Sequence, residues 1–170
     1  MVQVMKKLLL CAMLLVAATG AQAADAILKP FVLGSKGAGT VTEKTLQVKG
    51  ALAAAGFTVV GEYAPYQGTN IIVVTNDELK QNAAASEHGG YGAVQRVSVV
   101  EAGKEVQVSY TNPVYMSHVY RMKGDLSGVS TALAKALGRV EEFGAKGMTA
   151  KDARKYHYMF GMEYFDEPSL

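Results

Sequence analysis

The chain has 170 residues, with 17 Lys and Arg against 15 Asp and Glu, which gives a formal net charge of +2. Its first 23 residues carry two of the lysines and no acid, so the remainder is neutral, with 15 basic against 15 acidic side chains. A neutral chain without a basic stripe argues against nucleic acid as a partner, and its size fits one domain with a normal core.

The start of the chain has the pattern of a secretory signal peptide. Two lysines precede an apolar run over residues 8–18, and Ala21 and Ala23 form a small-x-small cleavage site. The apolar run is too short to span a bilayer, so we expect cleavage after Ala23, no membrane anchor and a periplasmic or secreted protein. Residues 1–23 are then the signal peptide, and residues 24–170 are the mature domain.

Cysteine chemistry is absent from the predicted mature chain. The only cysteine, Cys11, lies inside the apolar run of the signal segment. The mature protein therefore has no disulfide, no thiolate nucleophile and no cysteine-ligated metal.

The first part of the mature chain predicts a strand at residues 31–33, a glycine-rich turn at 34–39 and a helix over 42–55. The helix has an apolar stripe that includes Leu46 and Val48, with Thr42 as its N-cap and Gly56 after its end.

Two strands and a second helix follow, at residues 57–63, 70–75 and 77–85. The second strand is almost continuously apolar, which is typical of a central strand covered on both faces. Thr75 and Glu78 fit a capping box for the helix.

Residues 94–122 contain the clearest local pattern, two alternating runs around a glycine-containing turn. Such alternation predicts an antiparallel hairpin with one buried face. In the first strand, one face carries Gln95, Val97 and Val99, and the other carries Val94, Arg96, Ser98 and Val100. In the second strand, one face carries Val106, Val108 and Tyr110, and the other carries Glu105, Gln107, Ser109 and Thr111.

The rest of the chain predicts short helices and an aromatic tail. Asn112 and Pro113 begin a short helix to residue 120, and a longer helix runs over residues 126–137. Residues 141–147 are expected to be irregular, and residues 150–155 helical, after a cap at Thr149. Residues 144–170 form a C-terminal extension rich in aromatics and methionine, with a strand or arm at residues 156–160.

The order of these elements predicts an α+β fold, a mixed, largely antiparallel sheet with helices packed on one face. A helix running into Gly56 and Phe57, a strand running into a helix, and a valine-rich hairpin ending in Asn112-Pro113 complete the pattern. In this order of elements, the chain resembles the domain-of-unknown-function 302 family over about residues 29–138. The resemblance implies an α+β fold and brings no established catalytic role with it.

Methionine is distributed unevenly in the mature chain. All five of its methionines fall between residues 116 and 162, and two of the three histidines lie among them. Thioether and imidazole groups suit Cu(I) and also serve as axial haem ligands. The candidate ligands for copper or haem are His157, Met159, Met162, His118 and Met116. Alternatively, these methionines fill gaps and pack on the neighbouring aromatic rings.

The sequence favours a binding protein over an enzyme, because it offers no Ser/His/Asp constellation for hydrolysis. Arg96 and Arg121 are the arginines near the hairpin. Each is either a surface charge or a group that holds the carboxylate of a small ligand. A different hypothesis is that the tail from Tyr156 onward, without any cofactor, covers a sheet edge or pairs with another protein or a second copy, giving a homo-oligomer.

Overall fold

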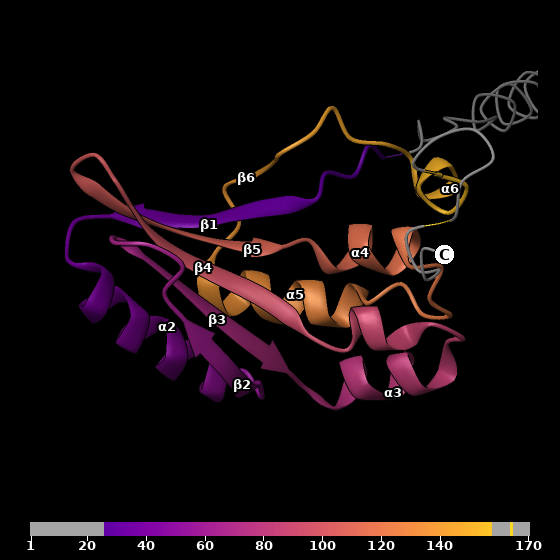
Figure 1. Cartoon of the computed structure of the whole chain (residues 1–170), viewed down its shortest axis with the longest axis horizontal. Helices are drawn as coiled ribbons and strands as arrows, with labels where there is room; N and C mark the ends of the chain where they lie inside the picture. The colour runs from indigo at the N-terminus through magenta and orange to yellow at the C-terminus, as the bar shows by residue number, and fades with distance from the viewer. Residues whose placement is uncertain (1–25, 158–163, 165–170) are drawn as a thin grey trace, which may run out of the picture.

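The computed structural model describes residues 26–157 and residue 164. One six-stranded sheet, with the strand order β2-β3-β4-β5-β1-β6, forms its centre (Figure 1). The strands are β1 (Phe31–Gly37), β2 (Thr58–Tyr63), β3 (Thr69–Thr75), β4 (Gln95–Ala102), β5 (Glu105–Thr111) and β6 (Glu141–Phe143). The helices are α2 (Val41–Ala54), α3 (Asp77–Ala85), the 3₁₀ helix η1 (Gly89–Gly92), α4 (Pro113–Val119), α5 (Ser127–Leu137) and α6 (Ala150–Ala153).

The predicted hairpin is the centre of the sheet. In the pairing of β4 with β5, Val97 faces Tyr110 and Val99 faces Val108, and all four side chains are buried. Every pairing between the six strands is antiparallel. The α+β class and the largely antiparallel sheet are therefore confirmed, and so is a hairpin with one buried face.

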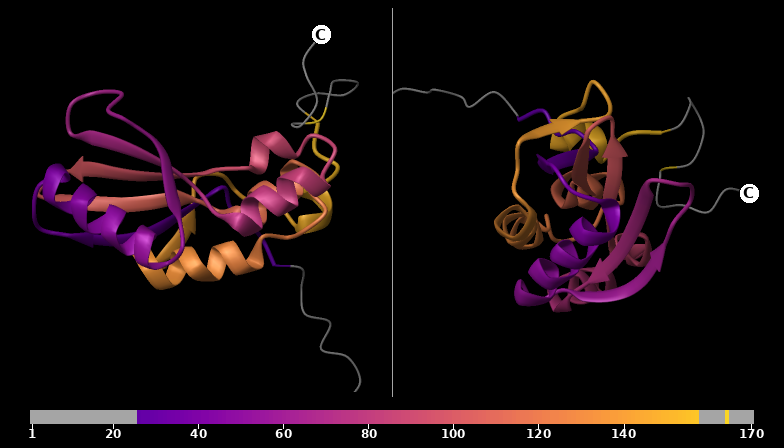
Figure 2. Two further views of the ribbon diagram at one scale, coloured as in Figure 1. Left: turned by 90° about the horizontal axis from the view of Figure 1, so that it is seen from below. Right: turned by 90° about the vertical axis from the view of Figure 1, so that its left-hand side faces the viewer.

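The main core lies between the sheet and the helices on one of its faces (Figure 2). Leu52 of α2, Leu79 of α3 and Leu133 of α5 are fully buried in the same cluster as the inward valines of the hairpin. Burial of one such leucine stabilises the fold by about 1.5–3 kcal/mol. The predicted arrangement, with helices packed on one face, is confirmed.

Helix α2 begins one residue earlier than predicted, and its N-cap is Thr40 rather than Thr42. The Thr40 hydroxyl accepts the N–H of Glu43 at 3.2 Å, and the Glu43 carboxylate accepts the N–H of Thr40 at 3.0 Å. These hydrogen bonds hold the pKa of Glu43 below its usual value. The prediction that Leu46 faces inward is also wrong, because the helix turns Thr45 inward and leaves Leu46 66 % exposed.

Helix α3 has the predicted bounds, but Asn76 caps it. The Asn76 side chain accepts the N–H of Leu79 at 2.9 Å. Thr75 is still the last residue of β3, and its hydroxyl donates to the carbonyl of Ala93 at 2.8 Å. The predicted capping box of Thr75 and Glu78 is wrong because that hydroxyl is engaged elsewhere.

Strand β3 is buried on one face only, which corrects the expectation of a doubly covered strand. Ile72 and Val74 are fully buried, whereas Ile71 and Val73 are half-buried on the other face. The described helices whose side chains join the main core leave that second face uncovered, and β3 lies next to the edge strand β2.

Two other segments differ from the prediction. β1 continues to Gly37 through the predicted turn, because after a bulge Ser35 pairs with Val108 and Gly37 with Val106. Residues 141–143, predicted to be irregular, form the short edge strand β6 on β1. Three residues are too few to show an alternating pattern.

The C-terminal helices form a second, smaller core. Tyr115 and Val119 of α4 pack with Ala153 of α6, and Met148 packs beside them. The Thr149 hydroxyl accepts the N–H of Asp152 at 3.1 Å, so the predicted cap of α6 is confirmed. Within the described part of the chain, no helix is long and apolar enough to cross a membrane.

Candidate functional site

The strand register places two rows of side chains on the face of the sheet opposite the main core. In the first row, Tyr63 of β2 pairs with Ile71, Ile71 with Ser98, and Ser98 with Ser109. The side chains at the middle of the sheet are therefore small, and a tyrosine stands at the edge.

The second row lies two residues along the strands. It contains Val73 paired with Arg96 on one side, and Thr111 paired with Phe31, then Phe143, on the other. The rings of Phe31 and Phe143 lie 5.7 Å apart at the opposite edge from Tyr63. Small residues along the middle with aromatic residues at both edges produce a trough.

The trough contains a first cavity of about 340 Å³. Tyr63 and Phe143 both line it, although β2 and β6 stand at opposite ends of the strand order. The sheet therefore curls around this cavity, as the twist of a sheet permits. We call this cavity the wide lobe; it is lined by Phe31, Tyr63, Ile71, Arg96, Ser98, Ser109, Tyr110, Thr111 and Phe143.

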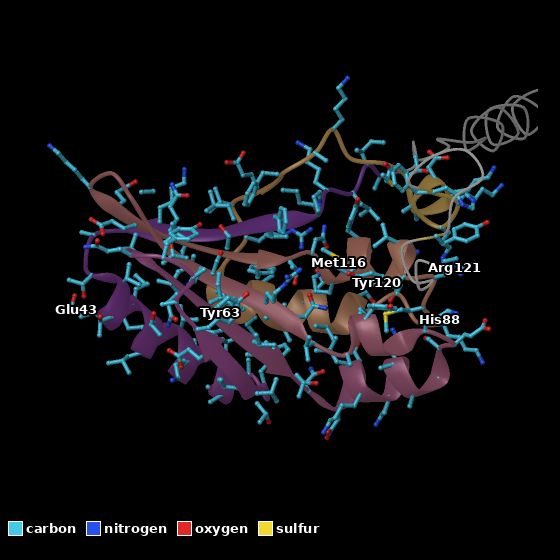
Figure 3. All side chains as sticks on the ribbon, in the orientation of Figure 1. Glu43, Tyr63, His88, Met116, Tyr120 and Arg121 are labelled. Atoms are coloured by element: carbon cyan, nitrogen blue, oxygen red, sulfur yellow. The ribbon has the colours of Figure 1, made fainter. Side chains whose placement is uncertain are left out.

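A second cavity, of about 190 Å³, continues the trough toward α4, and we call it the narrow lobe. It shares Arg96 and Thr111 with the wide lobe and is otherwise lined by Val73, Tyr91, Val94, Met116 and Tyr120. The rings of Tyr91 and Tyr120 stack at 5.7 Å on its wall. Figure 3 shows Tyr63 apart from Met116 and Tyr120 along the length of the molecule, as expected for side chains of different lobes.

Among the described residues, Arg96 is the only formally charged one that lines either lobe. Its backbone N–H donates to the Thr111 hydroxyl at 3.2 Å, and that hydroxyl donates to the buried Gln95 side chain at 2.5 Å. The Arg96 side chain is exposed, and its guanidinium has no hydrogen bond or ion pair with any residue among 26–157 and 164. The sheet fixes the backbone of this arginine, and no described residue pairs with its charge at the junction of the lobes.

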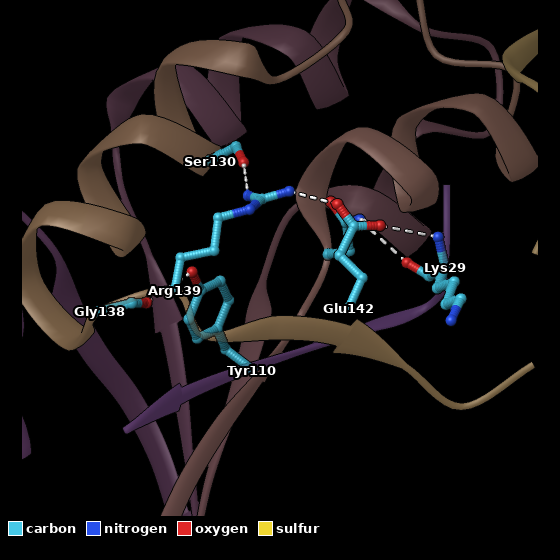
Figure 4. A network of polar contacts seen from close by, with 7 residues as sticks. Lys29, Tyr110, Ser130, Gly138, Arg139 and Glu142 are labelled. Carbon is cyan, nitrogen blue, oxygen red and sulfur yellow. Dashed lines mark hydrogen bonds and ion pairs between the residues drawn. The ribbon is translucent and has the colours of Figure 1, made fainter. Parts of the chain in front are cut away.

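A polar network holds the β6 wall of the trough in place (Figure 4). The Glu142 carboxylate accepts the N–H of Lys29 at 2.9 Å and the side-chain amide of Asn112 at 3.0 Å. Its other oxygen pairs with Arg139, whose guanidinium also donates to Ser130 at 3.1 Å. Because Phe143 follows Glu142 directly, this network positions an aromatic wall of the wide lobe.

Tyr110 supports the floor of the wide lobe from within the sheet. Its hydroxyl donates to the carbonyl of Gly138 at 3.0 Å, at the end of α5. Burial raises the pKa of the Tyr110 phenol. The phenol is thus a neutral structural donor.

Two of the predicted metal ligands, Met116 and His118, lie two residues apart in α4, so their side chains leave the helix on nearly opposite sides. Met116 lines the narrow lobe, whereas Nδ1 of His118 accepts a hydrogen bond from Nε of Arg154 at 3.1 Å. Burial, and next the Arg154 charge, lower the pKa of His118. Nδ1 is therefore occupied, and a cation stands beside it.

The remaining predicted ligands belong to the tail. The rings of His157 and Tyr164 have their centroids 3.8 Å apart, and the Arg121 guanidinium lies 3.9 Å from the Tyr164 ring centroid. Met159 and Met162 lie outside the described residues. Among those described, no group of three or more His, Cys, Asp or Glu side chains is arranged to hold a metal. The copper or haem site therefore stays a prediction.

Sequence reasoning did not find the trough as a site. Alternation placed Arg96, Ser98, Ser109 and Thr111 on one face, but the aromatic edges come from distant strands. The signal present in the sequence was a lone arginine among small hydroxyl residues on the outward face of the hairpin.

Comparison with known proteins supports the fold. The chain matches no family model and no curated protein. Among solved structures, it is similar to the uncharacterized conserved protein DUF302 from Bacillus stearothermophilus, with a TM-score of 0.57 and 14 % identity. The match covers 68 % of this chain and 100 % of that one. The expected resemblance to the domain-of-unknown-function 302 family is thus supported at the level of the fold.

Proposed function

We propose that this chain is an exported, non-catalytic binding protein that holds a small organic anion with an apolar body in the trough. The observation that carries the proposal is Arg96, with which no described residue pairs, in a largely apolar cavity whose other described lining residues are uncharged. A lone guanidinium there matches a carboxylate, which it can bind through two parallel hydrogen bonds.

The surface around Arg96 supports an apolar body on the ligand. Five large hydrophobic side chains that are more than a third exposed line the two lobes, and they are Phe31, Tyr63, Tyr91, Val94 and Phe143. Exposed apolar side chains gathered in a concave site are typical of binding surfaces. The volume of the wide lobe, about 340 Å³, lies within the usual range of small-molecule sites.

The hydroxyl groups of the trough can orient a bound ligand but are not arranged for catalysis. The Ser98 hydroxyl donates to the carbonyl of Ser109 at 3.3 Å, and the Thr111 hydroxyl is engaged with Gln95. Neither hydroxyl lies next to a histidine or carboxylate among the residues that line the lobes. Capture of the ligand, without turnover, is the function that this set of groups serves.

Calorimetric titration with hydrocinnamate, an aromatic carboxylate, tests the proposal. We expect saturable binding that Arg96→Gln weakens by about tenfold or more, because a charge-assisted hydrogen bond is removed. Lys104→Gln, a charge-matched change in the β4–β5 turn outside both lobes, should leave the affinity unchanged. Hydrocinnamyl alcohol, the neutral analogue, should not distinguish wild type from Arg96→Gln.

Two results would overturn the proposal. One is equal affinity of wild type and Arg96→Gln for the acid. The other is a dimer, detected by sedimentation, that binds no acid and dissociates in Arg96→Gln, which would assign the trough to a second copy of the chain.

Copper or haem binding remains a second proposal, supported by the confinement of the mature methionines to residues 116–162. It is tested by the ultraviolet–visible spectrum and metal content of protein purified without chelator. A Soret band would identify haem, and copper that is lost in His157→Ala would identify a metal site. A colourless, metal-free protein would refute both.

A further inference from the structure

The two lobes meet at Arg96, so the charge lies in the middle of the trough. Arg96 and Thr111 are the residues that line both cavities. The guanidinium stays available there because no described residue pairs with it. An anion bound to it would have open space on both sides.

The position of Arg96 along β4 fixes this geometry. Ser98 belongs to the wide lobe and Val94 to the narrow one, with Arg96 halfway between them. Val94 directly precedes β4, so at about 3.3 Å per residue of extended chain these two outer positions are up to ~13 Å apart. A simple acid with its carboxylate at one end would fill a single lobe and leave the other to water.

The lobes differ in size and wall. The wide lobe, of about 340 Å³, is nearly twice as large as the narrow lobe, of about 190 Å³. The aromatic edges of the wide lobe suit a ring. The narrow lobe is smaller, and Val73, Val94 and Met116 line it beside the stacked rings of Tyr91 and Tyr120. This smaller space suits a short flexible chain.

We propose that the ligand is a two-armed anion, an acidic group carried between two apolar groups, one aromatic and one short and aliphatic, as in an N-acyl amino acid. This inference rests on the proposed function, since it names the ligand class of the same trough. The acid pairs with Arg96, the ring enters the wide lobe and the acyl chain enters the narrow lobe.

The test compares N-butanoyl-phenylalanine with hydrocinnamate, which has the same ring and carboxylate but lacks the acyl arm. We expect wild type to bind the two-armed acid about tenfold more tightly, the gain expected from burying a short apolar chain. The methyl ester of the two-armed acid should lose most of its affinity, because it removes the charge.

Two tyrosines of similar exposure, Tyr91 at 52 % and Tyr63 at 49 %, supply matched variants. Tyr91→Ala removes a wall of the narrow lobe and should reduce the affinity for the two-armed acid alone. Tyr63→Ala removes a wall of the wide lobe and should weaken both acids. Circular dichroism of each variant would verify its fold.

The outcomes separate this inference from the proposed function. If wild type binds both acids equally, and Arg96→Gln weakens both, the two-armed ligand is refuted while the anion site stands. If Tyr91→Ala weakens both acids to the same degree, the separate narrow lobe is refuted. If neither acid binds wild type, both proposals fail.

Discussion

The polar network behind β6 makes a quantitative prediction about Glu142. The carboxylate accepts hydrogen bonds from the N–H of Lys29 and from the side chain of Asn112, which is fully buried. A hydrogen bond to a charged group contributes about 1.5–3 kcal/mol, and a buried donor left unpaired loses about that much. The ion pair of Glu142 with Arg139 contributes less than about 1 kcal/mol to stability, because solvent screens it: the arginine side chain is 38 % exposed.

We therefore expect Glu142→Ala to lower the free energy of unfolding by about 3 kcal/mol, from two such bonds. The assay is urea denaturation followed by circular dichroism. A shift of the transition midpoint without a change in the denaturant slope reports a change in stability. Glu141→Ala is the matched control, because Glu141 is the exposed neighbour in the same strand and should change the stability by less than about 0.5 kcal/mol. Equal midpoints for the two variants would refute the network as a source of stability.

Three further predictions concern other parts of the fold. The pKa of His118 in the folded chain lies below its unfolded value near 6.5, so the unfolded chain binds the proton more readily. The free energy of unfolding should therefore be highest above about pH 6.5 and fall as the pH is lowered. Urea denaturation at several pH values should show a smaller loss in His118→Gln. Leu133→Ala, at a fully buried position of the main core, should lower the free energy of unfolding by about 2–5 kcal/mol, and a smaller loss would mean that the helices repack. Gly89→Ala would place a Cβ 2.0 Å from the carbonyl oxygen of Ala83 and should destabilise by about 1–3 kcal/mol, whereas Gly90→Ala, with nothing within 4 Å, should not lower the melting temperature comparably.

The elements that the sequence predicted well are those with a strong local signal. Alternation over residues 95–111 predicted both strands of the hairpin and the residues that share each face of a strand. The glycine at 138 marked the end of α5, where the backbone has a φ of +86° that disfavours other residues. Such signals depend only on neighbouring residues, so they survive without knowledge of the tertiary structure.

The errors arose where a distant partner decided the outcome. Thr45 turns toward the sheet because Asn70 donates to its hydroxyl at 3.2 Å, and Leu46 is exposed as a result. β6 exists because β1 offers it an edge, and its three residues carry no periodic signal. The apolar run of β3 resembled a doubly buried strand because Ile71 and Val73 line the trough rather than a second layer.

The candidate site could be predicted only in part for the same reason. Local alternation correctly set Arg96 on the outward face of the hairpin, and the arginine was recognised as one of two that could hold a carboxylate. The walls depend on the register of four other strands, which brings Phe143 and Tyr63 to the same cavity from opposite edges. No pattern within one strand specifies that curl.

Stability and binding involve different residues of the trough. Glu142 and Tyr110 make partly buried hydrogen bonds that hold the walls, so their removal should unfold or deform the site. Arg96 contributes its backbone to the sheet but makes no side-chain bond to any described residue, and Arg96→Gln should therefore leave the unfolding midpoint nearly unchanged. The Arg96 side chain lies beside exposed aromatic rings and is not expected to stabilise the fold. Residues that folding does not require are expected at functional positions. Loss of anion binding in a variant of unaltered stability would separate the two roles and assign Arg96 to the ligand.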